Sequence, residues 1–182
     1  MKLSLRLIAV TLFVVTSVQI SYSQSSFSTA KIDDGDGCNW PFSSTTVNPN
    51  DGKIYTIWRD GAGTSAVYKL IKWSGSSWSS VGSFNISAIT TATTFNSASD
   101  YVSMAIDANG YFHIVFGASK TGSCCSQPRG FTYGYSTNGT SWTFEKVISY
   151  TDPSGWKNIS DPCIRVDKNG VPHVGGQFTN SN

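Results

Sequence analysis

A short sequence pattern recurs along this chain and constrains its fold more than any other feature. It reads Ile106-Asp-Ala-Asn-Gly-Tyr-Phe-His113 in the middle of the chain and Val166-Asp-Lys-Asn-Gly-Val-Pro-His173 near its end, and a looser copy spans 47–58. Successive copies stand about 60 residues apart, a spacing typical of propellers and solenoids. A repeat of this size cannot bury its apolar face alone, so neighbouring repeats must stack against one another.

Each repeat reads as strands joined by tight turns. An Asn-Gly pair between two apolar runs is a strong hairpin signal, because both residues tolerate positive φ. A second shared element, Trp73-Ser-Gly-Ser-Ser-Trp78 and Tyr135-Ser-Thr-Asn-Gly-Thr-Ser-Trp142, supplies the other tight turn of a repeat. The predicted strands lie near 43–47, 53–58, 65–73 and 77–84 in the first repeat, near 102–106, 111–116, 131–135 and 142–148 in the second, and from Pro162 onward in the third, which has two.

Four antiparallel strands per repeat predict an all-β fold built of β-propeller blades. The repeats near 41–85 and 100–149 give two complete blades, and the repeat near 160–182 gives a partial one. A flat β-sandwich is the alternative fold. Because closed propellers use four blades or more, we expect this chain to be a fragment of a larger propeller; ring completion by several copies is the alternative. We expect no helix beyond the N-terminal segment.

The first 23 residues predict a secretory signal peptide rather than part of the fold. Lys2 and Arg6 form a basic start, Leu7 to Val18 is a short apolar run, and small polar residues follow. An uncleaved signal anchor is the alternative. The partial propeller then occupies 24–182, and we expect it to be secreted or held at the cell surface, with no membrane span once the signal peptide is removed.

Charge excludes one class of partner. Both charges of the signal peptide are basic, so its removal brings the formal net charge of +2 close to zero. The remaining charges are scattered along the chain, whereas nucleic-acid binding needs a basic stripe that neutralises phosphates. We therefore expect no nucleic-acid partner.

Four cysteines remain in the exported part of the chain, and an even number in an oxidising compartment predicts disulfides. Cys124 and Cys125 fall in a long loop of the second repeat, whereas Cys38 and Cys163 precede or begin the first strands of the outer repeats. We predict at least one disulfide from Cys124 or Cys125 to Cys38 or Cys163. Zinc is the rival, but no Cys-x-x-Cys pair occurs, and the acidic loop 33–37 lacks the full ligand set of a calcium site. We predict neither a metal nor a cofactor.

The two recurring elements resemble the repeats of sialidase-like propellers, which carry the bacterial neuraminidase repeat, or Asp-box, with the usual form Ser-x-Asp-x-Gly-x-Thr-Trp. In the second repeat Ser136, Gly139 and Trp142 fit this form, whereas Asn138 replaces the aspartate and the turn is one residue shorter. The resemblance covers most of the chain from about residue 40 onward. In that family the boxes are structural turns remote from the catalytic centre, so the resemblance implies a fold rather than a chemistry.

The same resemblance tells us what a hydrolase of this type would need. Sialoside hydrolysis implies an arginine cluster, a tyrosine–glutamate nucleophile pair and an aspartic acid/base. After the signal peptide this chain has three arginines, Arg59, Arg129 and Arg165, and its one glutamate, Glu145, falls on a predicted outermost strand. The Arg-Ile-Pro signature of the family is absent. We therefore predict no catalytic residue and favour non-catalytic binding; the alternative is that the chain is the N-terminal part of a sialidase-like glycoside hydrolase.

Consecutive antiparallel strands run in opposite directions, so their connections alternate between the two ends of a blade. This alternation predicts which end binds a ligand. The tight turns fall on one face, and the long connections 59–65, 85–101, 117–130 and 149–161 fall on the other. Long loops on a rigid scaffold are where binding concentrates, and aromatic planes with a few charged groups suit a carbohydrate or an extracellular protein. The candidate ligand-binding residues on this face are Trp40, Arg59, Asp60, Tyr101, Arg129 and Trp156.

Other conspicuous side chains are expected to be structural. His113 and His173 occupy equivalent positions, where the first repeat has Tyr55, so we predict rings packed in the strand with one nitrogen hydrogen-bonded to a neighbour. Trp78 and Trp142 directly follow tight turns, and we expect them to close those turns.

Overall fold

The computed structural model describes residues 43–61, 63–120, 129–150 and 158–179. These residues form ten strands and one helix. Their bounds are β1 Ser43–Val47, β2 Ile54–Asp60, β3 Val67–Trp73, β4 Trp78–Asn85, α1 Ile86–Thr93, β5 Ser97–Ile106, β6 Phe112–Ser119, β7 Arg129–Ser136, β8 Thr143–Tyr150, β9 Asn158–Val166 and β10 Pro172–Thr179. The strands of both full repeats agree with the prediction to within a few residues.

The strands form three antiparallel sheets in which sequence neighbours pair. Two sheets have four strands, in the orders β1-β2-β3-β4 and β5-β6-β7-β8, and the third consists of β9 and β10. We call them blade 1, blade 2 and blade 3. None of them closes into a barrel. The predicted all-β class, with two four-stranded blades and a partial third, is confirmed.

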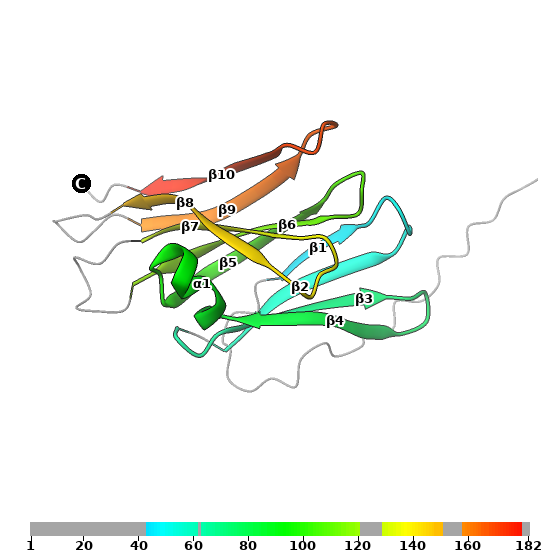
Figure 1. The fold of residues 1–182 in the computed structure, drawn as a ribbon, viewed down its shortest axis with the longest axis horizontal. Helices are drawn as coiled ribbons and strands as arrows, with labels where there is room; N and C mark the ends of the chain where they lie inside the picture. Colours follow the sequence, from blue (N-terminus) through cyan, green and yellow to red (C-terminus); the bar gives the residue numbers. More distant parts are fainter. Residues whose placement is uncertain (1–42, 62, 121–128, 151–157, 180–182) are drawn as a thin grey trace, which may run out of the picture. The chain divides into compact units, whose positions relative to one another are not determined.

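The hairpin turns lie at one end of the strands, the short-turn end, and helix α1 and the ends of β2, β6 and β8 lie at the other, the long-connection end, as Figure 1 shows. At the short-turn end, the β5–β6 turn is closed by hydrogen bonds of 3.0 Å from Asp107 N–H to Tyr111 O and from Gly110 N–H to Asp107 O. Gly110 has a φ of +80°, a conformation that costs glycine little. The β9–β10 turn repeats this geometry, with the same two bonds at Asp167 and Gly170. The recurring pattern in the sequence is therefore one recurring turn.

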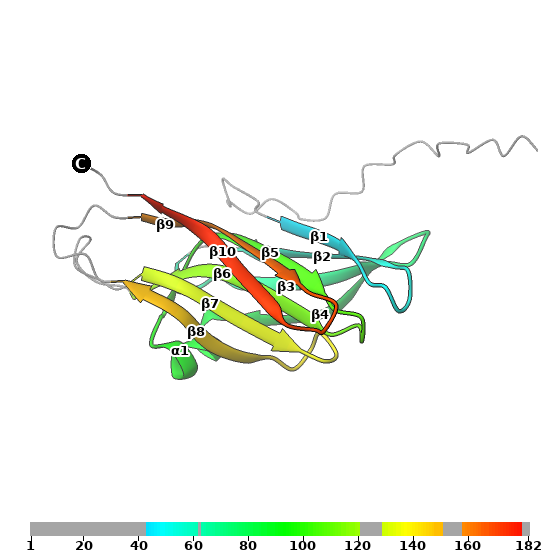
Figure 2. The same ribbon diagram turned by 90° about the horizontal axis from the view of Figure 1, so that it is seen from above.

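The first strands of the three blades are neighbours, with β5 between β1 and β9 (Figures 1 and 2). Two hydrogen bonds connect them at equivalent positions. Met104 N–H donates to Ser44 Oγ at 2.9 Å, and Ile164 N–H donates to Ser103 Oγ at 3.2 Å. Each blade thus holds the next through one hydroxyl on its first strand.

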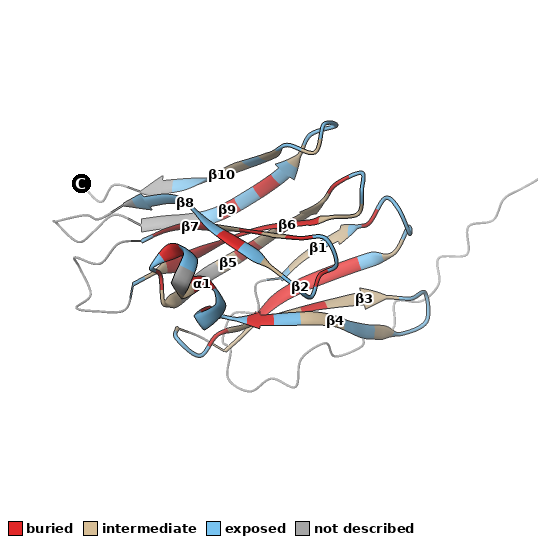
Figure 3. Cartoon of the chain, in the orientation of Figure 1, coloured by how far each residue is buried: buried red, intermediate tan, exposed pale blue. Residues whose placement is uncertain are grey.

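Most of the apolar core lies between blades 1 and 2. Aromatic rings from both blades meet there: Tyr68 stacks on Phe84 with 4.9 Å between centroids, and Phe116 lies 4.7 Å from Tyr68. A smaller cluster of Val115, Phe131 and Ile164 joins blade 2 to blade 3. Because β6 contributes to both clusters, it is buried along nearly its whole length, as Figure 3 shows.

Glycines allow blade 2 to approach the outer strands of blade 1. A Cβ at Gly139, in the β7–β8 turn, would lie 2.8 Å from Leu70 Cδ2 and from Val81 Cγ1. A Cβ at Gly82, on β4, would lie 2.5 Å from the backbone oxygen of Gly139. At Gly82 the blocking atom belongs to the backbone, so this position requires the smallest residue, and at Gly139 a larger residue would have to displace the side chains of Leu70 and Val81. The second recurring turn is therefore also an inter-blade contact.

The expectation of no helix after the signal segment is wrong, because α1 lies in the connection between blades 1 and 2. Asn85 caps its first turn, with Oδ1 accepting from Ala88 N–H at 3.3 Å, and Thr94 ends it with a φ of 67°. Ile86 and Ile89 are buried in the core cluster. The segment is short and rich in Thr and Ile, which are weak helix formers, so tertiary packing of the two isoleucines decides its conformation.

No helix within the described residues is long and apolar enough to cross a membrane. The predicted signal peptide, residues 1–23, lies outside the part of the chain that the structure describes.

Candidate functional site

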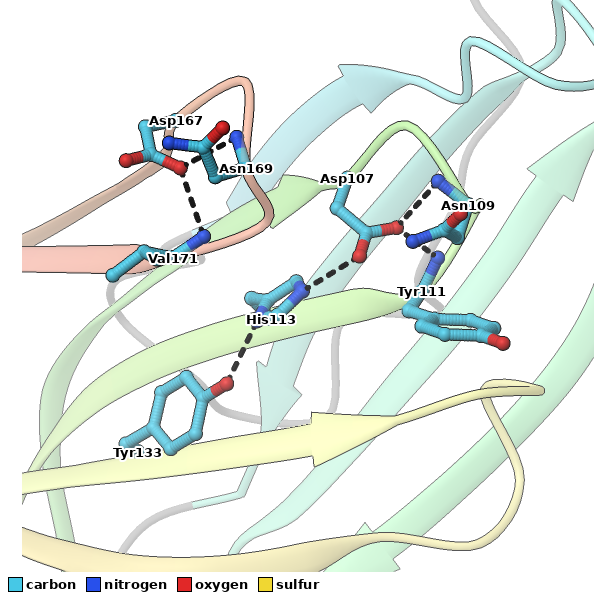
Figure 4. Close-up of polar contacts among 8 residues, drawn as sticks. All are labelled: Asp107, Asn109, Tyr111, His113, Tyr133, Asp167, Asn169 and Val171. Atoms are coloured by element: carbon cyan, nitrogen blue, oxygen red, sulfur yellow. Dashed lines mark hydrogen bonds and ion pairs between the residues drawn. The ribbon is translucent and has the colours of Figure 1, made fainter.

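The aspartate that begins the β5–β6 turn and the aspartate that begins the β9–β10 turn accept hydrogen bonds from backbone N–H groups. Asp107 Oδ1 accepts hydrogen bonds from Asn109 N–H at 2.9 Å and from Tyr111 N–H at 2.8 Å. Asp167 Oδ1 accepts equivalent bonds from Asn169 N–H at 2.8 Å and from Val171 N–H at 2.9 Å, and these bonds lower the pKa of the Asp167 carboxyl (Figure 4). The carboxylate of each aspartate thus stabilises its own turn.

The second oxygen of each aspartate faces a histidine from the following strand. In blade 2, Asp107 Oδ2 lies 3.6 Å from His113 Nε2, and both side chains are almost completely buried. At this distance the contact is an ionic or dipolar one rather than a formed hydrogen bond. On the other side of the ring, Tyr133 OH lies 2.7 Å from His113 Nδ1 (Figure 4). The predicted structural role of His113, with one nitrogen hydrogen-bonded, is confirmed.

Burial determines the protonation states of His113 and Tyr133. It lowers the pKa of His113 below its usual 6.5, against the opposite pull of Asp107. Burial, with a further contribution from the negative charge of Glu145, raises the pKa of Tyr133 to about 12. A neutral imidazole that accepts from the Tyr133 hydroxyl at Nδ1 carries its proton on Nε2, where it faces the Asp107 carboxylate. This arrangement stabilises a packed core and leaves no group open to a substrate.

Blade 3 has the same aspartate–histidine pair in an open setting. His173 Nε2 lies 3.5 Å from Asp167 Oδ2, but the histidine side chain is 65% exposed, against 4% for His113. In blade 1 the equivalent residue is Tyr55, whose hydroxyl donates to Asp51 Oδ2 at 2.9 Å. An acidic turn residue therefore contacts the same strand position in every blade.

The second recurring turn is also held by its own side chains. Ser136 Oγ accepts from Gly139 N–H at 2.8 Å, and Asn138 Oδ1 accepts from Thr140 N–H and Ser141 N–H, each at 2.9 Å. The indole of Trp142 donates to Gly139 O at 3.2 Å, which confirms the predicted turn-closing role of this tryptophan. In blade 1, Trp78 packs against Trp73 with 5.3 Å between ring centroids.

The described members of the predicted ligand-binding set lie at the long-connection end of the strands. Arg59 and Asp60 end β2, Tyr101 lies in the first half of β5, and Arg129 begins β7. Arg129 is exposed and Tyr101 is half-buried, whereas Arg59 is only 7% exposed. Asp60 forms an ion pair with Lys69. The other two predicted residues, Trp40 and Trp156, lie outside the described residues.

A polar groove, which the sequence did not predict, follows the first strands toward the short-turn end. It has a volume of about 450 Å³ and is lined by Ser44, Thr45, Thr46, Ser103, Met104, Ala105, Ile106, Arg165 and Val166. Arg165 stands one residue before the end of β9, where the equivalent residues are Thr46 and Ala105. The one available sequence signal was this replacement of a small residue by an arginine on a first strand.

A second hollow, of about 390 Å³, lies between the outer strands of blades 1 and 2. Its floor is aromatic, with Phe84, Trp142 and Phe144. Two of its polar residues are already engaged: Asn85 Oδ1 caps α1, and Thr140 Oγ1 donates to Asn138 Oδ1 at 2.9 Å. This hollow therefore offers few hydrogen bonds to a ligand.

Catalytic and metal-binding groups are sparse in the described part of the chain. Glu145 is exposed on the outermost strand β8, opposite Tyr133 in the ladder. Within the described residues, no group of three or more His, Cys, Asp or Glu side chains is placed to hold a metal ion. Cys163 is a free, exposed thiol on β9. Cys38, Cys124 and Cys125 lie outside the described residues, so a bridge that involves them stays a prediction.

No protein-family model matches this chain, and no curated protein matches it.

Proposed function

We propose that this chain is a secreted or cell-surface propeller-repeat protein that binds glycans or proteins without catalysis. The observation that carries the proposal is the placement of Asp60, Tyr101 and Arg129. They come from three strands of two adjacent blades, and all three lie at the long-connection end. A carboxylate, a phenol and a guanidinium on a rigid scaffold suit a ligand rich in hydroxyl or amide groups.

The distribution of the remaining polar groups supports binding rather than catalysis. The aspartates of the recurring turns accept backbone hydrogen bonds, and His113 is enclosed between Asp107 and Tyr133. Hydrolysis of a glycosidic bond uses a pair of carboxyl groups that flank the scissile bond. Glu145 lies on an outermost strand, and the described lining of the polar groove contains no carboxylate.

A glycan array probed with the full secreted chain tests this function, together with a capture experiment on extracellular proteins. Arg129→Ala is expected to weaken the binding of whichever ligand is found at least tenfold. Lys168→Ala, an exposed substitution in the β9–β10 turn at the opposite end, is the matched control and should leave binding unchanged. A ligand whose affinity falls with Lys168→Ala and not with Arg129→Ala would contradict the assignment of the binding face.

The second candidate function is that of the N-terminal part of a sialidase-like glycoside hydrolase. It is favoured by Arg165, a cation on a first strand that lines the polar groove. We expect no turnover of a fluorogenic sialoside by this chain alone. Turnover that Glu145→Gln abolishes would replace the binding proposal with this one.

A further inference from the structure

The hollow of about 390 Å³ between blades 1 and 2 is built from the outer strands of these blades and from α1, which joins them. Its volume lies within the range of about 300–1,000 Å³ that small-molecule sites occupy. No wall of the hollow depends on blade 3. The lining residues are Val67, Ser83, Phe84, Asn85, Ala88, Thr140, Trp142 and Phe144.

A backbone contact between the two blades fixes one edge of the hollow. Gly82 directly precedes Ser83, and a Cβ at Gly82 would lie 2.5 Å from the backbone oxygen of Gly139 and 3.1 Å from the Cα of Thr140. The backbones that carry Ser83 and Thr140 are therefore in contact, so these two lining residues have fixed places. At the other blade-to-blade contact, α1 packs against β8.

The floor of the hollow is an aromatic surface with a fixed orientation. Phe84 and Phe144 are only 8% and 9% exposed, whereas Trp142 is half-buried and offers more ring surface to a ligand. The indole of Trp142 lies within 13° of parallel to the Phe144 ring and 5.2 Å from the centroid of Phe84. Its N–H is bound to Gly139 O, so the ring presents carbon atoms rather than its donor.

The rim keeps a small number of hydrogen-bonding groups for a ligand. Asn85 Oδ1 accepts from Ala88 N–H and from Ser87 Oγ, so the side-chain NH₂ of Asn85 remains as a donor. Ser83 is exposed, and its hydroxyl has no hydrogen-bond partner among the described residues. Thr140 Oγ1 donates to Asn138 Oδ1, so its lone pairs remain as acceptors.

These groups together select a chemical class of ligand. None of the described lining residues carries a charge, so an ionic ligand would find no partner of opposite charge in the hollow. A pyranose ring has an apolar face of C–H groups and hydroxyl groups around its edge. Such a ring matches an aromatic floor with donors and an acceptor on the rim. An apolar side chain would match the floor alone.

We propose that this hollow binds one neutral pyranose residue. The C–H face of the sugar lies on Trp142, and its hydroxyl groups accept from Asn85 Nδ2 and Ser83 Oγ and donate to Thr140 Oγ1. The hollow shares no residue with the set that includes Asp60, Tyr101 and Arg129 at the long-connection end. The inference is therefore independent of the function proposed above.

The test titrates the full chain with the methyl glycosides of glucose, galactose, mannose and N-acetylglucosamine. At least one glycoside should cause a saturable shift of the Trp142 indole N–H resonance in nitrogen-15 NMR. Asn85→Asp keeps a good N-cap for α1 but replaces the NH₂ donor by an oxygen. This variant should bind that glycoside about fivefold more weakly, because it loses one hydrogen bond.

Matched variants locate the binding. Ser83→Ala should also weaken it about fivefold, whereas Ser80→Ala, at an exposed position on the same strand, should leave it unchanged. Arg129→Ala should have no effect, which separates this site from the long-connection end.

The absence of a saturable shift with every glycoside would overturn the proposal. Equal affinities in the wild-type protein, Asn85→Asp and Ser83→Ala would also overturn it, because the rim would then make no bond to the sugar. The apolar probe p-cresol is titrated in parallel. Tighter binding of p-cresol than of any glycoside, unchanged by Asn85→Asp, would assign the hollow to an apolar side chain instead.

Discussion

Ser44 on β1 accepts a hydrogen bond of 2.9 Å from the backbone N–H of Met104, which follows it by 60 residues and lies on β5. Ser103 repeats this relationship with Ile164, 61 residues later, at 3.2 Å. Both serines stand three residues before the end of their strand. One hydroxyl per blade therefore fixes the level at which the next blade stacks.

Ser44→Ala should destabilise the fold by about 1–2 kcal/mol, because it leaves the N–H of Met104, a residue only 3% exposed, without its acceptor. Urea unfolding of the two proteins measures the difference. Ser76→Ala removes an exposed hydroxyl from the β3–β4 turn and is the control. Equal unfolding midpoints for Ser44→Ala and Ser76→Ala would mean that the inter-blade bond contributes nothing to stability.

A pair of glycines separates backbone strain from inter-blade packing. Gly75 and Gly139 both have positive φ, of 101° and 77°, so alanine at either position pays a conformational cost of about 1 kcal/mol. A Cβ at Gly75 meets nothing within 4 Å, whereas a Cβ at Gly139 meets Leu70 and Val81 at 2.8 Å. Gly139→Ala should therefore lower the free energy of unfolding by about 1–3 kcal/mol more than Gly75→Ala.

Thermal and urea unfolding of these two variants check the prediction. If both lose the same stability, the approach of the β7–β8 turn to blade 1 is looser than the structure shows.

The strands and turns were predictable because two local signals agree in every repeat. Glycine-containing tight turns and the apolar runs that flank them depend only on near neighbours in the chain, so β1 to β10 lie close to where the sequence placed them. Helix α1 was not predictable in this way. Its sequence is a poor helix former, and only the burial of Ile86 and Ile89 against two different blades selects the helix.

The candidate sites depend on contacts between strands, some within one repeat and some between repeats, which the local sequence does not encode. Arg165 reaches the polar groove because β9 lies beside β5, a relation set by inter-blade packing. The contact of Tyr133 with His113 crosses from one strand to a diagonal position on the next, so it requires the register as well as the strands. Four residues of the predicted ligand-binding set lie at the same end of the strands, and their role in binding stays a prediction. The burial of their side chains, above all that of Arg59, followed only from the structure.

The Tyr133–His113 hydrogen bond should contribute measurably to stability. Tyr133→Phe removes the donor and leaves Nδ1 of a buried ring unsatisfied, so we expect a loss of about 1–2 kcal/mol. Tyr135→Phe, on the same strand, is a matched control that keeps the donor to His113. A double-mutant cycle of Tyr133→Phe with His113→Phe isolates the pair, and a coupling energy near zero would show that the two side chains act independently.

Acidification should destabilise the protein through His113. Burial keeps the pKa of this imidazole in the folded protein below the value of 6.5 that it has when exposed. Between the two pKa values the unfolded chain binds more protons than the folded one, so the free energy of unfolding decreases as the pH falls below about 6.5. Urea unfolding between pH 7.5 and pH 5 measures this slope, above the range in which Asp167, with its lowered pKa, becomes protonated.

The variants identify the group responsible. His113→Phe should be less stable at pH 7.5, because Tyr133 loses its acceptor, but its stability should vary less between pH 7.5 and pH 5. His173→Gln replaces an exposed ring and leaves His113 in place, so the wild-type slope should remain. A slope that persists in His113→Phe would assign the acid sensitivity to another group, and a flat profile in the wild-type protein would show that the buried imidazole accepts a proton without opening the fold.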